Sequence, residues 1–168
     1  MVIETKRLII SKFSISDAPF FLELVNSPNW IKYIGDRNIK TIEDAEKSIT
    51  NGHLKSYKEH GFGFYKLALK EKNIPIGTCG LIKRDTLAEV DLGFAFLPEH
   101  EGKGFGFEAS GEVMKLAKHQ FNLKKLVAIT NPDNKNSIKL LEKLRFTLEK
   151  EVSPFKDDEK LLLFTKIL

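Results

Sequence analysis

The sequence predicts a mixed α/β fold of the α+β kind, in which helices flank a mostly antiparallel sheet. Residues 62–97 alternate apolar and polar positions through three segments separated by short polar turns, which is typical of an antiparallel meander. The segments on either side repeat apolar residues at three- and four-residue spacing, which is typical of amphipathic helices. The 168 residues fit one domain, so we expect a single folded unit over residues 1–168.

The N-terminal part of the chain predicts one strand and two helices. Leu8–Phe13 is short and apolar, which favours a strand. The first helix begins at Ser16 or Asp17 and ends at Pro28. The second covers residues 41–59, with acidic residues in its first turn, where the helix dipole favours them.

The rest of the chain predicts the meander followed by a helix, a strand, a helix and two strands. Asparagine, aspartate and proline separate these segments. We expect strands over 62–69, 74–82, 90–97, 125–130, 146–152 and 161–167, and helices over 107–121 and 137–144.

Composition excludes several classes of protein. Apolar residues make up 42% and charged residues 30%, which excludes a disordered or low-complexity chain. The net charge of +4 is too small to indicate nucleic-acid binding, and the excess is local, because residues 102–145 hold nine Lys or Arg against four Asp or Glu. The lone Cys79 indicates a reducing compartment, and no signal peptide or membrane span is visible. We expect a cytoplasmic protein with no membrane and no specific nucleic-acid partner.

Three glycines, Gly102, Gly104 and Gly106, separate the strand that ends at Pro98 from the helix that begins near Phe107. Backbone without side chains can turn its N–H groups around an anion, and a diphosphate at a helix N-terminus gains free donors and a favourable dipole. The spacing is not the G-x-G-x-x-G of dinucleotide-binding folds, and Gly104 stands where a phosphate-binding P-loop needs Ser or Thr. The glycines alone therefore leave two alternatives, an anion-binding loop and a flexible loop of small residues.

Several motifs stand in a fixed order along the chain. The proline, the glycine loop, a helix and a strand are followed by Asn134-x-x-Ser137 and by the segment Leu140–Phe146. This order resembles the GCN5-related N-acetyltransferase (GNAT) superfamily. The run Glu4–Leu8, the Asp17-Ala18 pair and the run Tyr33–Arg37 are similar to the branch of ribosomal-protein N-terminal (alanine) acetyltransferases, so the resemblance covers nearly the whole chain.

The resemblance implies a seven-stranded sheet with about four helices, splayed between its fourth and fifth strands. It implies acetyl-CoA as co-substrate and no metal. Phe96 and Leu97 would pair with the pantetheine arm, and Asn134 would reach the cofactor across the splay, with a backbone-stabilising turn residue as the alternative. Backbone N–H groups of the glycine loop would hold the diphosphate, and the loop residues are Gly102, Lys103, Gly104, Phe105, Gly106 and Phe107.

The chemistry of amine acetylation needs a group that takes a proton, because a free alkyl amine has a pKa of about 10. Asp91 aligns with the position of the superfamily's base, and Glu89 lies two residues earlier on the same strand face, so either could act, directly or through water. A solvated acid at the strand edge is the alternative. Ser137 stands where relatives carry the acid for the leaving thiolate, with a helix cap as its alternative.

Four aromatic residues would line the acceptor pocket, with ordinary core packing as the alternative: Trp30, Tyr33, Phe62 and Phe64.

Two residues depart from the pattern of the superfamily. Glu101 stands where the loop usually carries Gln or Arg, and we expect its carboxylate to point away from the diphosphate. Arg145 replaces the glycine usual at the exit of the last helix, where a left-handed conformation costs a non-glycine residue about 1–2 kcal/mol.

The sequence therefore predicts an acetyl-CoA-dependent N-acetyltransferase that moves an acetyl group to a primary amine by direct attack in a ternary complex. The acceptor is a ribosomal or other protein N-terminus or a small-molecule amine, and a homodimer is left open. A non-catalytic acyl-CoA-binding or regulatory domain on the same fold is the alternative, suggested by Glu101 and Arg145. A nucleic-acid-binding role comes third and rests only on the excess of lysine.

Overall fold

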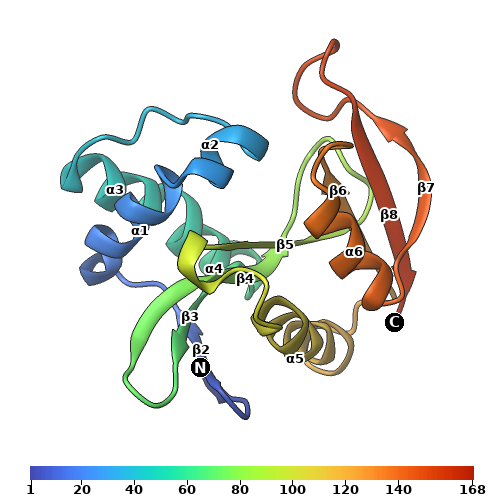
Figure 1. Ribbon diagram of the computed structural model, residues 1–168. Coiled ribbons are helices and arrows are strands. Elements are labelled where there is room, and N and C mark those ends of the chain that lie inside the picture. Colours follow the sequence, from blue (N-terminus) through green and yellow to red (C-terminus); the bar gives the residue numbers. More distant parts are fainter.

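Eight strands form the central sheet of the computed structural model, which describes residues 1–168 (Figure 1). The strands are β1 (Val2–Glu4), β2 (Leu8–Lys12), β3 (Phe64–Leu69), β4 (Ile74–Ile82), β5 (Val90–Phe96), β6 (Lys125–Thr130), β7 (Thr147–Val152) and β8 (Leu161–Ile167). Their order across the sheet is β1-β2-β3-β4-β5-β6-β8-β7. Every neighbouring pair is antiparallel except β5 and β6, which confirms the predicted fold class.

The helices lie between these strands in the chain. They are α1 (Ala18–Val25), α2 (Pro28–Tyr33), α3 (Ile42–Ser48), α4 (Lys55–His60), α5 (Phe105–His119) and α6 (Lys135–Lys143). A π-helical turn, Ile49–Leu54, joins α3 to α4 into one continuous helical run. Two short 3-10 helices precede α1 and follow β5.

The sheet opens between β5 and β6. These are the fourth and fifth of the predicted strands, because β1 was not predicted, so the opening lies where the resemblance implies. These two strands pair with each other only at Val90 with Leu126 and at Asp91 with Val127, and no further residues of β5 and β6 pair with each other. Because both strands continue for several residues beyond Asp91, their ends diverge. The splay leaves one edge of β5 without a strand partner.

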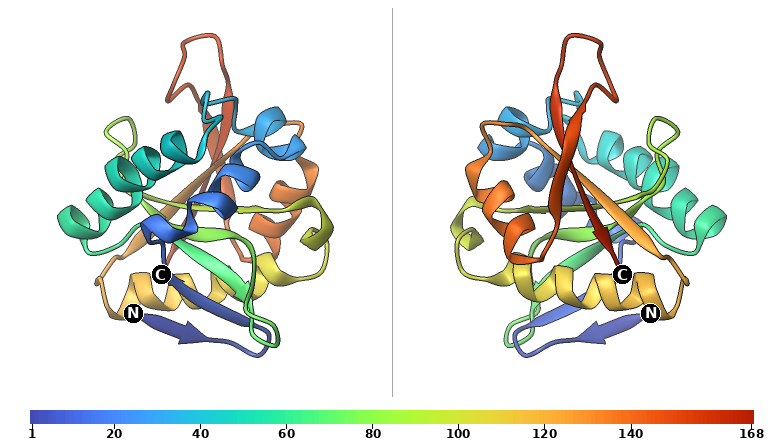
Figure 2. Two further views of the ribbon diagram at one scale, coloured as in Figure 1. Left: turned by 90° about the vertical axis from the view of Figure 1, so that its left-hand side faces the viewer. Right: turned by 90° about the vertical axis from the view of Figure 1, so that its right-hand side faces the viewer.

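Two hydrophobic cores occupy opposite faces of the sheet. The larger core contains residues of β2–β6 together with α5 and α6, and the smaller one contains residues of α1–α3 and the π-helical turn with Leu97. In the left view of Figure 2, α1–α4 lie in front of the sheet. The glycine loop therefore follows a strand, β5, that both layers cover.

The element count differs from the prediction at the N-terminus. Val2–Glu4 pairs with β2 in register, Val2 opposite Ser11, so the sheet has eight strands instead of seven. Three residues are too few to show an alternating pattern. Pro28, expected to end the first helix, begins α2, because the first helical position needs no N–H donor. The result is five helical runs instead of about four.

The two C-terminal helices each begin two residues before their predicted start. Phe105 and Gly106 lie in the first turn of α5 and not in the loop. Asn134 caps α6 by accepting a hydrogen bond from the Ser137 backbone N–H at 3.2 Å, so Ser137 is not the cap.

Arg145 adopts the left-handed conformation expected of it, with φ of 69°. Its N–H donates to Glu142 O, and the Phe146 N–H donates to Leu141 O, each at 2.9 Å. This is the Schellman arrangement that usually uses glycine. None of the helices combines the length and the apolar character needed to cross a membrane.

Candidate active site

The glycine loop and the start of α5 form an anion cradle. Gly102 and Gly104 have φ of 71° and 83°, a conformation that L side chains rarely adopt. Gly104 is the N-cap of α5 and offers no side chain, so the N–H groups of Phe105, Gly106 and Phe107 have no capping partner. Free donors at the positive end of a 15-residue helix fit the diphosphate of a coenzyme A molecule.

The acidic residue in this loop is turned away from the cradle, as expected. Both carboxylate oxygens of Glu101 accept hydrogen bonds from the Asn29 side-chain amide, at 2.9 and 2.8 Å. Asn29 belongs to α2, so this contact also joins α2 to the loop. The negative charge of Glu101 is thereby directed toward α2.

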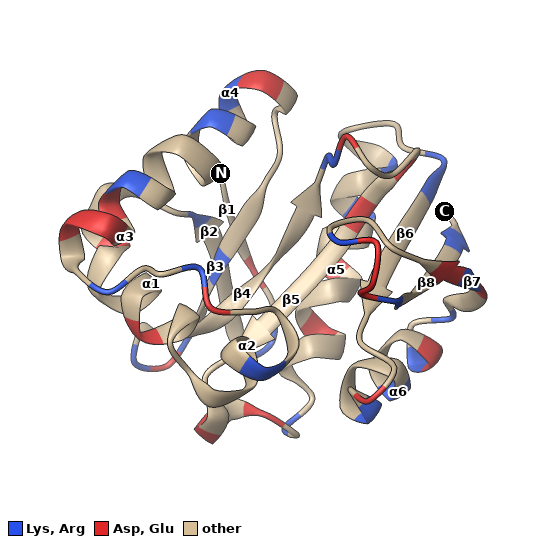
Figure 3. Cartoon of the chain, turned by 90° about the horizontal axis from the view of Figure 1, so that it is seen from above, with Lys and Arg blue, Asp and Glu red and all other residues tan.

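Basic residues lie on α6, which carries several blue segments in Figure 3. Lys135, Lys139 and Lys143 recur every four residues on α6 and are exposed. The Lys143 ammonium lies over the ring of Phe107, 4.4 Å from its centroid. Part of the local positive charge seen in the sequence therefore lies beside the cradle.

The free edge of β5 offers backbone groups for an extended ligand. Backbone groups of alternate residues along a strand point to the same side. The Leu97 N–H donates to Ile76 O at 2.9 Å, and the Leu97 carbonyl accepts from the His100 N–H at 3.0 Å. The Leu97 N–H is therefore not available to the pantetheine arm and its carbonyl already accepts one hydrogen bond, which argues against the expected pairing of Leu97. The backbone N–H and C=O groups of Phe94 and Phe96 point to the edge of β5 opposite that of the Leu97 N–H, so they face the splay.

Asn134 and Ser137 stand together at the start of α6, beside β6. The Asn134 side-chain oxygen is occupied by the Ser137 N–H, which leaves its amide N–H groups free. Both side chains are half-buried, and the Ser137 hydroxyl makes no hydrogen bond within the protein. Asn134 thus stabilises the local backbone, as its alternative role required, and its side-chain amide N–H groups remain available to a ligand.

Asp91 lies where β5 and β6 part, on the face of the sheet that α1–α4 cover. Residues alternate between faces along a strand, and Ala95, two positions beyond Gly93, packs against the smaller core. Asp91 is 2% exposed; its Oδ2 accepts from Arg84 Nε at 2.8 Å, and its Oδ1 has no partner. Burial raises the pKa of Asp91 to about 6, against the opposing effect of the Arg84 charge. A carboxyl group with this pKa can take a proton near neutral pH.

Glu89 is not on β5. It lies in the bend just before the strand, half-buried and without an ion-pair partner. The expectation that Glu89 shares a strand face with Asp91 is therefore wrong, because β5 begins only at Val90. Glu89 stays close to Asp91 in the chain and keeps a free carboxylate.

The four aromatic candidates for the acceptor pocket divide between the two faces. Phe62 is buried in the larger core, where its ring packs against Phe121 at 5.3 Å, so it does not belong to the acceptor side. The Phe64 ring lies on the opposite face of the sheet, the face of the smaller core, where a Cβ on Gly93 would come within 2.9 Å of the ring. Trp30 is 7% exposed, and its Nε1 has no hydrogen-bond partner. Tyr33 is half-buried on α2.

Sequence reasoning missed the surroundings of His53, which the π-helical turn places against aromatic side chains of the smaller core. Its ring lies 4.5 Å from Phe13 and 4.9 Å from Phe21, and its Nδ1 is buried without a partner. Burial, with a smaller effect of the Arg37 charge, lowers the pKa of His53 to about 4. π-helical turns occur often at functional sites, but nothing in the sequence marks one.

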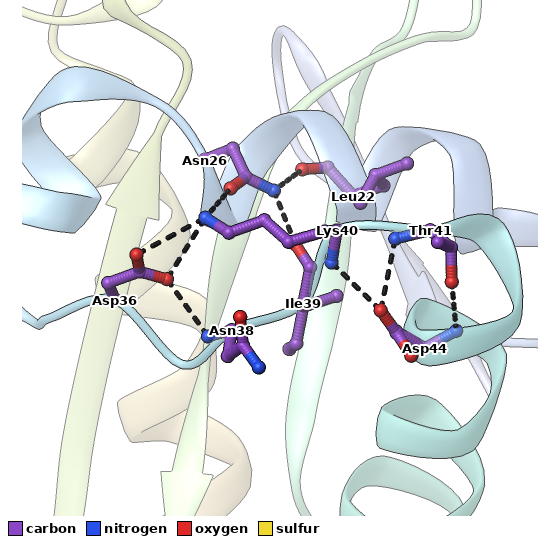
Figure 4. A network of polar contacts seen from close by, with 8 residues as sticks. All are labelled: Leu22, Asn26, Asp36, Asn38, Ile39, Lys40, Thr41 and Asp44. Carbon is purple, nitrogen blue, oxygen red and sulfur yellow. Dashed lines mark hydrogen bonds and ion pairs between the residues drawn. The ribbon is translucent and has the colours of Figure 1, made fainter.

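The segment between α2 and α3 borders this side and is fastened to α1, as Figure 4 shows. The Asn26 amide donates to Leu22 O and Ile39 O, both at 2.8 Å. The Lys40 ammonium donates to Asn26 Oδ1 at 3.0 Å and to Asp36. These contacts hold the segment in one position against the smaller core.

A sheet that opens beside an anion cradle, with a buried carboxyl group of raised pKa at the point of opening, suits acyl transfer from a nucleotide-linked thioester. The acetyltransferase (GNAT) domain family matches residues 7–147 of the chain. The chain therefore belongs to this family, which confirms both the superfamily resemblance and the prediction of an acetyltransferase enzyme.

Relatives agree with this assignment. The uncharacterized N-acetyltransferase YnaD of Bacillus subtilis is 27% identical over 144 residues, 86% of this chain and 81% of that protein. The ribosomal-protein-S5-alanine acetyltransferase of Vibrio fischeri has the same fold, with a TM-score of 0.84, 20% identity and coverage of 99% and 96%. The ribosomal-protein α-N-acetyltransferase RimL in complex with coenzyme A gives a TM-score of 0.86 at 15% identity, with coverage of 100% and 98%.

Proposed function

We propose that this protein is an acetyl-CoA-dependent N-acetyltransferase, one domain over residues 1–168, that acetylates a primary amine by direct attack in a ternary complex. The observation that carries the proposal is the pairing of the anion cradle with Asp91 across the splay. The cradle would hold acetyl-CoA from one side of β5, and Asp91 faces the side on which an amine could enter. We place the enzyme in the cytoplasm, which its single free cysteine fits.

Acetyl-CoA would supply the activated acetyl group as a thioester. The chain's own residues would bind and orient the two substrates and move protons. Asp91 Oδ1 has no partner in the protein and would accept the proton of the attacking amine, directly or through a water molecule. Glu89 is the second candidate for this base. Backbone N–H groups of the β5 edge would polarise the acetyl carbonyl, a role worth about 3–4 kcal/mol in comparable acyl transfers.

The Ser137 hydroxyl would protonate the leaving thiolate. Its hydrogen is not committed within the protein, and Asn134 beside it keeps free amide donors for the cofactor. The sequence contains no tyrosine after Tyr65, so a tyrosine acid on α6 is excluded.

For the acceptor we propose the N-terminus of a protein, with a ribosomal protein as the first to test and a small-molecule amine as the second candidate. Two relatives in fold are named for acetylating ribosomal proteins. Trp30, Tyr33 and Phe64 would line the acceptor side, and the unpartnered Trp30 Nε1 could donate to a peptide carbonyl. The homodimer stays a prediction.

The experiment that separates an enzyme from a binding module measures release of free thiol. Acetyl-CoA is mixed with the protein and with a panel of amines: ribosomal-protein N-terminal peptides, their N-terminally blocked forms, polyamines and amino acids. An enzyme releases thiol with at least one free amine and none with its blocked form. Binding of acetyl-CoA without thiol release above background for any amine would favour the non-catalytic alternative.

A further inference from the structure

The turn between β1 and β2 contacts the glycine loop and the first turn of α5. Arg7 is the central residue of this contact. Its Nε donates to Glu108 Oε2 at 2.7 Å, its backbone N–H donates to Glu108 Oε1 at 2.8 Å, and its Nη1 donates to the carbonyl of Lys103 at 2.9 Å. Its guanidinium also covers the ring of Phe105, 4.3 Å from Cζ to the ring centroid.

Glu108 fixes this arginine in place. The Thr5 hydroxyl donates to Glu108 Oε1 at 2.5 Å, so one carboxylate receives hydrogen bonds from the turn at both of its oxygens. Burial by itself would raise the pKa of Glu108, but the hydrogen bonds from Thr5 and Arg7 and the Arg7 charge outweigh it and lower the pKa. Glu108 is therefore ionised at neutral pH, and its charge in the first turn of α5 is matched by Arg7.

The hydrogen bond to Lys103 determines which way a peptide group faces. No peptide bond of the chain is cis, and in a trans peptide the C=O and the following N–H point in opposite directions. The Lys103 carbonyl points at Arg7, so the Gly104 N–H points away from Arg7. A Cβ on Gly104 would lie 3.2 Å from Arg7 Nη2, so a larger residue at this position would crowd the guanidinium.

We propose that Arg7 is a positioning residue for the diphosphate site: by holding the Lys103 carbonyl it keeps that oxygen out of the anion cradle and aims the Gly104 N–H into it. The inference rests on the proposed function, since it assumes that the cradle binds coenzyme A. It assigns a role to Arg7 within the run Glu4–Leu8, which the mechanism leaves unused.

The test is a calorimetric titration of coenzyme A into the wild type and into Arg7→Ala. We expect the dissociation constant of Arg7→Ala to rise about tenfold or more, as loss of a charged hydrogen-bond network implies. Lys6→Ala is the matched control, because Lys6 is a neighbouring exposed cation without a hydrogen-bond partner; it should stay within about twofold of wild type. An Arg7→Ala dissociation constant equal to that of Lys6→Ala overturns the proposal.

Two further readouts separate positioning from simple charge attraction and from a direct role in catalysis. At about 1 M salt, where the screening length is about 3 Å, the difference between wild type and Arg7→Ala should persist. Its disappearance there means long-range attraction and contradicts the proposal. With saturating acetyl-CoA, kcat should stay near wild type while KM for acetyl-CoA rises; a fall in kcat at unchanged KM also contradicts it.

Arg7→Lys and Glu108→Gln keep the proposal testable if Arg7→Ala does not fold. Lysine keeps the charge but cannot contact both Glu108 and the Lys103 carbonyl, so its affinity for coenzyme A should lie between those of wild type and Arg7→Ala; wild-type affinity in Arg7→Lys overturns the proposal. Glu108→Gln should weaken binding by releasing Arg7. A wild-type protein that does not bind coenzyme A at all refutes the proposed function itself, which is a different result.

Discussion

Asp91 experiences two opposing effects on its carboxyl group. The Arg84 guanidinium stabilises the ionised form through one oxygen, while burial at 2% exposure removes the water that would stabilise it. Burial is the largest effect and outweighs the charge and hydrogen bond of Arg84 together with the Ile129 backbone, so the pKa rises to about 6. The same residue in a fully paired site would be a structural ion pair with a low pKa.

The rate of acetyl transfer should therefore rise with pH around a midpoint of about 6. Asp91→Asn should remove this rising limb of the pH–rate profile. It should also lower kcat by about a hundredfold or more, because proton transfer by a positioned base contributes that much. Arg84→Gln should move the midpoint to higher pH, since the Arg84 charge lowers the pKa. The measurement is kcat against pH, with the limb of the amine itself separated by its pKa of about 10.

Glu89→Gln is the control for this assignment. It should keep both the limb and most of the rate. If Glu89→Gln loses the limb and Asp91→Asn keeps it, Glu89 is the base.

The Glu101 carboxylate is held away from the cradle by the Asn29 amide, which donates to both of its oxygens. Asn29→Ala should raise KM for acetyl-CoA about threefold to tenfold, because the freed carboxylate can approach the diphosphate and such a charge effect is worth about 1 kcal/mol. The double variant Asn29→Ala, Glu101→Gln should restore KM. Equal impairment of the single and double variants would show that the charge is not the cause.

At the level of elements, α5 and α6 come close together at Gly106. A Cβ at this position would lie 2.6 Å from Leu140 Cδ2. The sequence predicted Gly106 only as part of an anion loop, but it lies in the first turn of α5 and also permits this helix contact.

Gly106→Ala should destabilise the protein by up to about 1 kcal/mol, because the Leu140 side chain must move to admit the methyl group, and this cost exceeds the gain in helix propensity. Gly111 is the matched control in the same helix, because a Cβ there would meet nothing within 4 Å. Gly111→Ala should stabilise the protein by about 0.5–1 kcal/mol through its better helix propensity. Urea unfolding of the two variants checks both signs, and a Gly106→Ala as stable as Gly111→Ala would contradict the packing argument.

The sequence predicted the elements with a clear period and missed those set by tertiary contacts. The meander, the long helical run and the splay followed from hydrophobic spacing and the resemblance. β1 is too short to show a period, and the π-helical turn depends on packing that residues 49–54 do not encode locally.

Of the candidate site, the sequence predicted the glycine loop but not the side chains that tertiary contacts place. The glycine loop could be predicted from the chain because three glycines stand between a strand and a helix, where two of them adopt a positive φ that glycine accepts without strain. Phe62 was misplaced because an aromatic residue near a strand start does not reveal which face it covers. His53 and Arg84 were missed because their roles come from neighbours distant in the sequence.

For the whole molecule, two buried groups oppose each other in the pH dependence of stability. The pKa of His53 falls from 6.5 to about 4 on folding, so the unfolded chain binds the extra proton and stability falls as pH drops through this range. The pKa of Asp91 rises from 3.8 to about 6, so the folded protein binds the extra proton and stability rises as pH drops through nearly the same range.

The free energy of unfolding of the wild type should therefore change little between pH 6 and pH 4. His53→Leu should become more stable on acidification across this window, and Asp91→Asn should become less stable, each by up to about 1.4 kcal/mol per pH unit. Urea unfolding at several pH values measures this, with His119→Gln, an exposed histidine, as the control. Identical slopes in both buried variants would contradict the assigned pKa directions.

The central claim is that the cradle at the start of α5 and the splay beside it bind acetyl-CoA for transfer to an amine. A calorimetric titration of acetyl-CoA into the protein tests it most directly. The account predicts one site per chain with a dissociation constant in the range of about 1 μM to 1 mM that is usual for enzyme substrates. No heat of binding and no rise in melting temperature at millimolar acetyl-CoA would contradict it.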